Sequence, residues 1–210
     1  MVQLFLQEYQ AIKSFIRHQF NVIVILLTAT FSLVMQWYRP LGPTRVTNHF
    51  FYFFLLPVFV TLIILKKNPL HSGLKLGPYR IWIFYVLFTI VISFPLLLIS
   101  VGWSDVHAFY QQNFNYYDFL FKMVPLLFFW EFLLRGFLLF GLKEELGAAA
   151  IVIQMVPFVL LHLGKPEVET VSCLLTGLWF GFIAYRGNSF WPAFLIHIFI
   201  NFTVKYFINV

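Results

Sequence analysis

The chain has 210 residues, of which 61% are hydrophobic and only 10% are charged, and its mean hydropathy is +0.85. This composition excludes an ordinary soluble domain and indicates a polytopic membrane protein. The net charge is +6, but the basic residues are scattered between apolar runs, which argues against a nucleic-acid-binding surface. Because Cys173 is the single cysteine, an intramolecular disulfide and a multi-cysteine metal site are excluded as well.

The apolar pattern predicts one amphipathic helix followed by membrane spans. Apolar residues recur at three- and four-residue steps over residues 2–20, which predicts an interfacial helix, with an eighth buried element as the alternative. Seven apolar runs then approach the ~20 residues that a bilayer core requires. They lie near residues 20–37, 50–66, 80–101, 118–142, 147–163, 170–186 and 190–208. The predicted fold is therefore all-α, a polytopic helix bundle in the membrane.

The distribution of basic residues predicts the orientation of this bundle. Lysine and arginine in the cytoplasmic connections outnumber those on the other side of a membrane. One set of alternate connections contains Lys13, Arg17, Lys66, Lys67, Lys75, Arg80, Lys143 and Arg186. The other set contains Arg39, Arg45, Lys122 and Lys165. We therefore expect the N-terminus to be cytoplasmic.

Polar residues within the last four predicted spans fall into three groups. Glu131 and Arg135 are four residues apart, so a helix places them on one face where they can pair. His162 ends the fifth predicted span, and His197 and Asn201 share one face of the seventh. Each group alone is explained by helix packing or capping. Together, in an otherwise apolar segment, they predict one hydrophilic pocket with the groups that hydrolysis requires.

The order of these motifs resembles the CAAX-protease and bacteriocin-processing (CPBP) family of intramembrane proteases, which are type II CAAX prenyl endopeptidase-like. The resemblance covers about residues 118–205 and rests on Glu-x-x-x-Arg-Gly at 131–136, Phe-x-x-x-His at 158–162 and His-x-x-x-Asn at 197–201 after "GNSFWPAFLI". We expect a single membrane domain in which, from the apolar pattern, residues 1–19 form the interfacial helix and 20–117 the N-terminal membrane helices. The resemblance implies that residues 118–210 form the catalytic core. It also implies an endopeptidase that acts on a peptide or protein substrate within the lipid bilayer, prenylated or bacteriocin-like. The compact chain suits a bacterial inner membrane.

The resemblance assigns a role to each site residue. His162 matches the histidine that activates water together with a glutamate, His197 and Asn201 match the pair that stabilises the oxyanion, and Arg135 matches an arginine that braces the site. The family motif carries two adjacent glutamates. Glu131 matches the second, and Trp130 stands at the first. Adjacent side chains on a helix point ~100° apart. Glu131 can therefore take the place of the missing carboxylate only if the helix is rotated or if a water molecule bridges the gap.

These observations leave three function classes open. We favour a metal-free, glutamic-type protease with no cofactor, in which water polarised at Glu131 and His162 attacks a peptide carbonyl. An alternative is a zinc site with two histidines and one carboxylate as ligands, formed by Glu131, His162 and His197. Trp130 favours a catalytically inactive relative that acts as an immunity or scaffolding protein. A small proton- or ion-coupled transporter is the third class, since intramembrane ionisable residues also serve transport.

Overall fold

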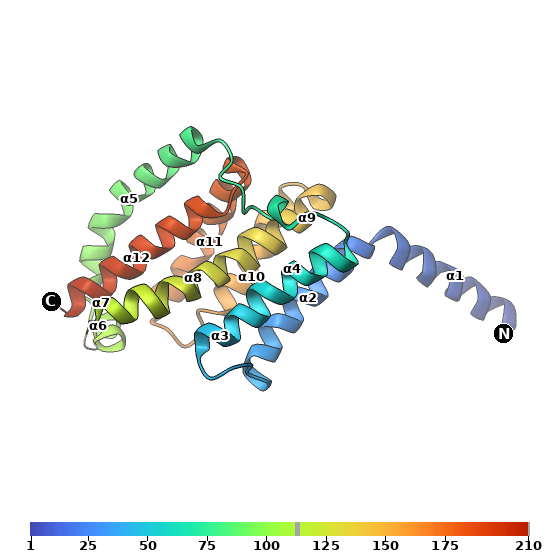
Figure 1. The fold of residues 1–210 in the computed structure, drawn as a ribbon, viewed down its shortest axis with the longest axis horizontal. Coiled ribbons are helices and arrows are strands. Elements are labelled where there is room, and N and C mark those ends of the chain that lie inside the picture. The colour runs from blue at the N-terminus through green and yellow to red at the C-terminus, as the bar shows by residue number, and fades with distance from the viewer. Residues whose placement is uncertain (112–113, 210) are drawn as a thin grey trace.

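The computed structural model describes residues 1–111 and 114–209, and these residues contain helices but no strand (Figure 1). The α-helices are α1 (Val2–His18), α2 (Phe20–Tyr38), α3 (Arg45–His49), α4 (Leu56–Phe59), α5 (Tyr79–Val101), α6 (Ser104–Tyr110), α7 (Tyr116–Asp118), α8 (Val124–Glu131), α9 (Leu139–Leu146), α10 (Ala149–Leu160), α11 (Glu167–Gly187) and α12 (Trp191–Asn209). The π-helical segments are η1 (Phe50–Leu55), η2 (Val60–Ile64), η4 (Phe119–Met123) and η5 (Phe132–Leu138), and η3 (Pro69–His71) is a 3-10 turn. The predicted all-α membrane bundle is confirmed.

Six helical segments in the described part of the chain are long and apolar enough to cross a membrane. They are Phe20–Tyr38, Arg45–Ile64, Tyr79–Val101, Tyr116–Leu146, Glu167–Gly187 and Trp191–Asn209. The remaining predicted span, 147–163, is the shorter helix α10 of 12 residues. Glycines with positive φ lie on both sides of it, Gly147 at 55° and Gly164 at 88°, and such residues commonly mark helix ends. At ~1.5 Å per residue, α10 spans only part of a bilayer core.

The N-terminal helix α1 lies outside the bundle. None of its residues is buried, and in Figure 1 it extends away from the other helices. The reading of residues 2–20 as a buried element is therefore wrong. The placement of α1 at the membrane interface stays a prediction.

The fourth span, Tyr116–Leu146, is the central element of the bundle. It is the longest of the six, and 61% of its most apolar window is buried, more than in any other span. It contains Glu131 at the end of α8 and Arg135 within η5. All seven residues of η5 are buried. A π-helical turn inside an α-helix is frequently found at a functional site.

Helix α10 lies closely against α11. A Cβ atom on Gly181 would come within 2.4 Å of Nε2 of Gln154, so the absence of a side chain at Gly181 leaves room for this amide between the two helices. The same Nε2 atom of Gln154 donates to the carbonyl of Gly177 at 2.8 Å. After α11 the chain reverses at Asn188, whose φ of 46° is left-handed, and α12 returns to pack against α5, α8 and α11. This arrangement brings the end of α10 beside α12.

The two ends of the bundle differ in charge. At one end Lys67 pairs with Glu144, and the indole of Trp191 donates to the carbonyl of Leu74 at 2.9 Å. Six residues of the larger basic set lie in or next to the connections at this end: Lys66, Lys67, Lys75, Arg80, Lys143 and Arg186. At the other end, where Figure 1 shows α6, α7 and the C-terminus, the hydroxyl of Tyr110 donates to Glu169 at 2.6 Å. The candidate site lies nearer this second end.

Candidate active site

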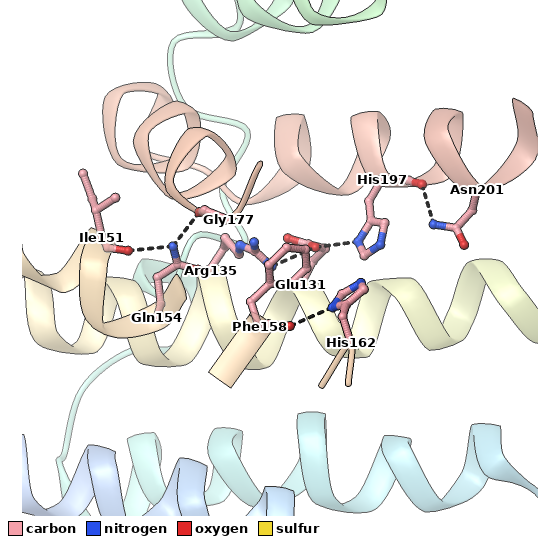
Figure 2. Close-up of polar contacts among 9 residues, drawn as sticks. All are labelled: Glu131, Arg135, Ile151, Gln154, Phe158, His162, Gly177, His197 and Asn201. Carbon is pink, nitrogen blue, oxygen red and sulfur yellow. Dashed lines mark hydrogen bonds and ion pairs between the residues drawn. The ribbon is translucent and has the colours of Figure 1, made fainter. Parts of the chain in front are cut away.

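Glu131 is the centre of a buried ionic cluster (Figure 2). Its side chain is fully buried, and its Oε1 atom accepts hydrogen bonds from Nη1 of Arg135 at 3.1 Å and from Nδ1 of His197 at 2.7 Å. We assign Nδ1 of His197 as the donor because a carboxylate at this position accepts. The predicted contact between Glu131 and Arg135 is present. His197 joins it from α12, on the opposite side of the cluster.

Arg135 is held by charge and by aromatic rings. Its guanidinium carbon lies 4.1 Å from the centroid of the Phe158 ring and 5.4 Å from that of Phe180. A guanidinium at these distances is attracted to the face of the ring. Its Nε and Nη2 atoms have no hydrogen-bond partner within residues 1–111 and 114–209. Arg135 therefore serves mainly as the counter-charge of Glu131, which would be very costly to bury alone.

His162 lies in the turn after α10, outside the six candidate spans. Its Nδ1 atom donates to the carbonyl of Phe158 at 2.7 Å, an assignment that follows because a carbonyl only accepts. Burial lowers the pKa of His162 to about 4, and the positive charge of Lys165 adds to this effect. The imidazole is therefore neutral at physiological pH, with Nδ1 protonated and a lone pair on Nε2.

Asn201 follows His197 by one helical turn. Its Nδ2 atom donates to the carbonyl of His197 at 3.1 Å, so the amide is turned toward its own helix (Figure 2). The amide is only partly buried. A rotation about its side-chain torsions would free an amide N–H for a ligand.

Trp130 packs beside His162. The two ring centroids lie 6.2 Å apart in a T-shaped arrangement. On another side the indole stacks on His49, with centroids 6.1 Å apart and planes 16° from parallel, and it also contacts Phe53. An aromatic ring with no basic group thus stands next to the histidine that was expected to activate water. The carboxylate of Glu131 is hydrogen-bonded to His197 and not to His162.

A cavity of about 420 Å³ brings the remaining groups together. His162, His197 and Asn201 line it, in walls formed mostly by apolar side chains of α5, α6, α11 and α12. Glu131 and Arg135 do not line this cavity and lie behind His197. The cavity reaches the end of the bundle formed by α6 and the start of α11, where Tyr110 and Glu169 also line it. The five predicted residues therefore form one connected group.

Several polar residues near the site were not predicted. Gln154 is fully buried and joins α10 to α11, and His49 is buried against Trp130. At the cavity, Glu169 accepts from Lys165 at 2.7 Å as well as from Tyr110. The spacing of Lys165 and Glu169, four residues apart, was a usable signal for their pairing. His49 and Trp130 are far apart in the sequence, so no local spacing pattern predicts their contact.

The same residues also bear on metal binding. Within the described ranges, no group of three histidine, cysteine, aspartate or glutamate side chains is placed to hold a metal ion. In the alternative zinc set, Nε2 of His162 and Nε2 of His197 are free to ligate a metal. Glu131, however, does not line the cavity that both imidazoles line, and its Oε1 atom already accepts from Arg135 and His197. These residues do not fit a zinc site in this arrangement. The expectation that the protein needs no cofactor stays a prediction.

The comparison with protein families agrees with the motif order. Residues 112–203 match the family described as type II CAAX prenyl endopeptidase Rce1-like. No curated protein and no solved structure matches the chain. The matched segment contains the three motifs, and therefore all five predicted site residues and Trp130. The resemblance is confirmed over this segment, and with the six apolar helices it supports a protease embedded in a membrane.

Proposed function

From the match of residues 112–203 to the CAAX endopeptidase family, we propose that this protein is an intramembrane endopeptidase whose attacking water is activated by the Glu131–His197 pair. The observation that carries this proposal is the 2.7 Å hydrogen bond from Nδ1 of His197 to Glu131, made behind a cavity that His197 itself lines. The proposal changes the role that the family motif suggests for His197, from oxyanion stabilisation to proton transfer.

The tautomer of His197 supports this role. Nδ1 donates a hydrogen bond to Glu131, so in the neutral form of the imidazole the proton is on Nδ1 and Nε2 carries a lone pair. A buried carboxylate in this position holds the imidazole in one orientation and stabilises the imidazolium that forms on proton uptake. Arg135 balances the charge of Glu131 while the site is at rest.

His162 has a related but weaker role. Its Nδ1 atom is also used as a donor, so Nε2 can accept a hydrogen bond from the same water. A pKa of about 4 makes His162 a poor base at neutral pH. We therefore assign His162 to orienting the water and His197 to removing its proton.

The reaction then follows ordinary peptide hydrolysis. The oxygen of water bonds to the peptide carbonyl carbon while its proton moves to Nε2 of His197, and negative charge develops on the carbonyl oxygen. The amide of Asn201, turned away from its helix, donates to that oxygen. The C–N bond breaks as His197 returns the proton to the leaving amine, which yields a new carboxylate and a new amine.

The substrate and its location follow from the cavity. Its mostly apolar walls suit a membrane-associated peptide, prenylated or bacteriocin-like. The cavity reaches the end of the bundle with fewer basic residues, formed by α6 and the start of α11. If the basic end is cytoplasmic, as the distribution of lysine and arginine predicts, cleavage takes place toward the opposite face. The proposed location is a bacterial inner membrane.

Trp130 supports a second candidate, a family member without catalytic activity. The indole next to His162 leaves that imidazole with a backbone carbonyl as its hydrogen-bond partner instead of a carboxylate. Such a protein would retain the cavity for binding and not for cleavage.

Cleavage of a membrane-inserted peptide library separates these two candidates. The purified protein is reconstituted in liposomes, and the products are read by mass spectrometry for the wild type, Glu131→Gln and the control Glu144→Gln. Glu144 lies in the sequence KEELG at residues 143–147, and its side chain is 68% exposed. Cleavage by the wild type and Glu144→Gln, but not by Glu131→Gln, supports the protease. Binding without cleavage by all three supports the second candidate.

A further inference from the structure

Gln154 is a fully buried amide that the proposed reaction does not use. Its Nε2 atom donates to the carbonyls of Ile151 and Gly177, each at 2.8 Å. We assign the nitrogen to this position because a carbonyl oxygen only accepts. Both N–H groups of the amide are therefore used. Its Oε1 atom is buried and has no hydrogen-bond partner among residues 1–111 and 114–209.

Arg135 carries the complementary groups. Nη1 of its guanidinium donates to Oε1 of Glu131 at 3.1 Å, whereas its buried Nε and Nη2 atoms have no partner in the same part of the chain. Nearly all buried polar groups in folded proteins are paired, either within the protein or with ordered water. The second oxygen of Glu131, Oε2, is also buried and unpaired. The free donors of Arg135 therefore have two candidate acceptors, one on Glu131 and one on Gln154.

Two ring contacts place the guanidinium of Arg135 close to Gln154. The ring of Phe158, one turn after Gln154 on the same face of α10, lies 4.1 Å from the guanidinium carbon. The ring of Phe180, from the helix to which the amide is bonded, lies 5.4 Å from the same carbon. Figure 2 shows Arg135 between the amide of Gln154 and the carboxylate of Glu131. Gln154 therefore lies behind the guanidinium, on the side away from the reacting groups.

We propose that one buried water molecule joins Arg135 to Gln154, accepting from Nε and Nη2 of the guanidinium and donating to Oε1 of the amide. A buried water typically makes about three hydrogen bonds to polar groups that are otherwise unpaired. Gln154 is then a positioning residue, because it holds the guanidinium from behind while Nη1 stays directed at Glu131. Its effect on cleavage rests on the proposed endopeptidase function, whereas the water site itself does not.

Thermal unfolding of the full chain in detergent tests whether Gln154 and Arg135 are coupled. Gln154→Met removes the acceptor with little change in volume. It is measured in the wild type and in a background without the guanidinium, Arg135→Met with Glu131→Gln, which leaves no unpaired charge buried. The matched control is Met155→Ala, because Met155 adjoins Gln154 on α10 and lies against Gly177 of α11.

The expected result is a difference between the two backgrounds. Gln154→Met should lower the melting temperature by about 5 °C more in the wild type, as the loss of one hydrogen bond to a charged group implies. Met155→Ala should lower it equally in both, because independent sites are additive. Equal effects of Gln154→Met in the two backgrounds would show that Gln154 only joins α10 to α11, and would overturn the proposal.

A crystal structure of the wild type, at a resolution that shows ordered water, tests the water directly. It should contain a water within ~2.7–3.2 Å of both Oε1 of Gln154 and a guanidinium nitrogen of Arg135. A structure in which the free N–H groups of Arg135 turn to Oε2 of Glu131, with no water at Gln154, would overturn the proposal. This measurement needs no variant and no activity.

Cleavage kinetics test the positioning role. Gln154→Met should lower kcat about tenfold and leave KM within about twofold, because it disturbs the reacting groups and not the substrate cavity. Met155→Ala should change neither value. A wild type that does not cleave refutes the protease, and the water site then stands or falls with unfolding and the crystal structure. Coupled unfolding with an unchanged kcat would overturn the positioning role.

Discussion

The Nδ1 atom of His197 lies 2.7 Å from Oε1 of Glu131, although 66 residues separate the two in the chain. This contact joins the fourth span to α12 at a depth where both side chains are buried. It also decides which imidazole the carboxylate orients. His162, the other candidate, donates to a backbone carbonyl instead.

Replacement of Arg135 should destabilise the protein strongly. Arg135→Met leaves the fully buried Glu131 without its cation, and breaking a buried pair in this way costs about 3–5 kcal/mol. Thermal unfolding in detergent measures the loss. Arg135→Met combined with Glu131→Gln should recover most of it, because no unpaired charge then remains. A single variant as stable as the wild type would show that Glu131 is not ionised in the folded protein.

Variants of Trp130 test whether the departure from the family motif abolishes activity. Trp130→Phe should cleave within about threefold of the wild type, because the indole contributes packing against His162 and no proton transfer. Trp130→Glu should move the acid limb of the pH–rate profile to higher pH, since a carboxylate next to an imidazole favours its protonated form. Cleavage that appears only in Trp130→Glu would identify the natural chain as the non-catalytic family member.

The low pKa of His162 predicts an acid-sensitive fold. Its pKa is about 4 in the folded protein, below its ordinary value of 6.5, so the unfolded chain binds more protons between these two values. Stability should therefore be complete above about pH 6.5 and fall by up to ~3 kcal/mol as the pH approaches 4. Unfolding of the wild type and His162→Gln across this range measures the effect. The variant should lose part of the pH dependence, and identical curves would contradict the prediction.

Membrane sidedness is tested with single cysteines in a Cys173→Ser background. Ser104→Cys reports the end with α6, and Leu76→Cys reports the basic end, and both native side chains are exposed. An impermeant maleimide should label Ser104→Cys in intact cells and Leu76→Cys only after permeabilisation. The opposite pattern would place the opening of the cavity on the cytoplasmic face.

Local periodicity accounts for what could be predicted at the site. The pairing of Glu131 with Arg135 and the shared face of His197 and Asn201 depend only on the four-residue repeat of a helix. Which histidine meets Glu131, and that His49 stacks on Trp130, depend on how distant helices pack. Those contacts are tertiary and have no signature in spacing.

The membrane spans show the same difference between what local sequence patterns predict and what only the structure reveals. Six apolar runs predicted the observed helices to within a few residues, because composition and length decide whether a segment can cross a bilayer. The run at 147–163 did not reveal that α10 stops at Leu160, since its residues are as apolar as those of a full span. The positive φ angles at Gly147 and Gly164, which a hydropathy pattern does not report, mark where the helix is interrupted.

Single-turnover cleavage of one peptide in liposomes tests the role of the Glu131–His197 pair most directly. The measurement compares the rates of His197→Ala and His162→Ala. Loss of a general base costs about 10²–10⁴-fold, so His197→Ala should fall to the level of Glu131→Gln, while His162→Ala should retain at least tenfold more activity than either. A larger loss in His162→Ala than in His197→Ala would make His162 the base, and would contradict the assignment of water activation to Glu131 and His197.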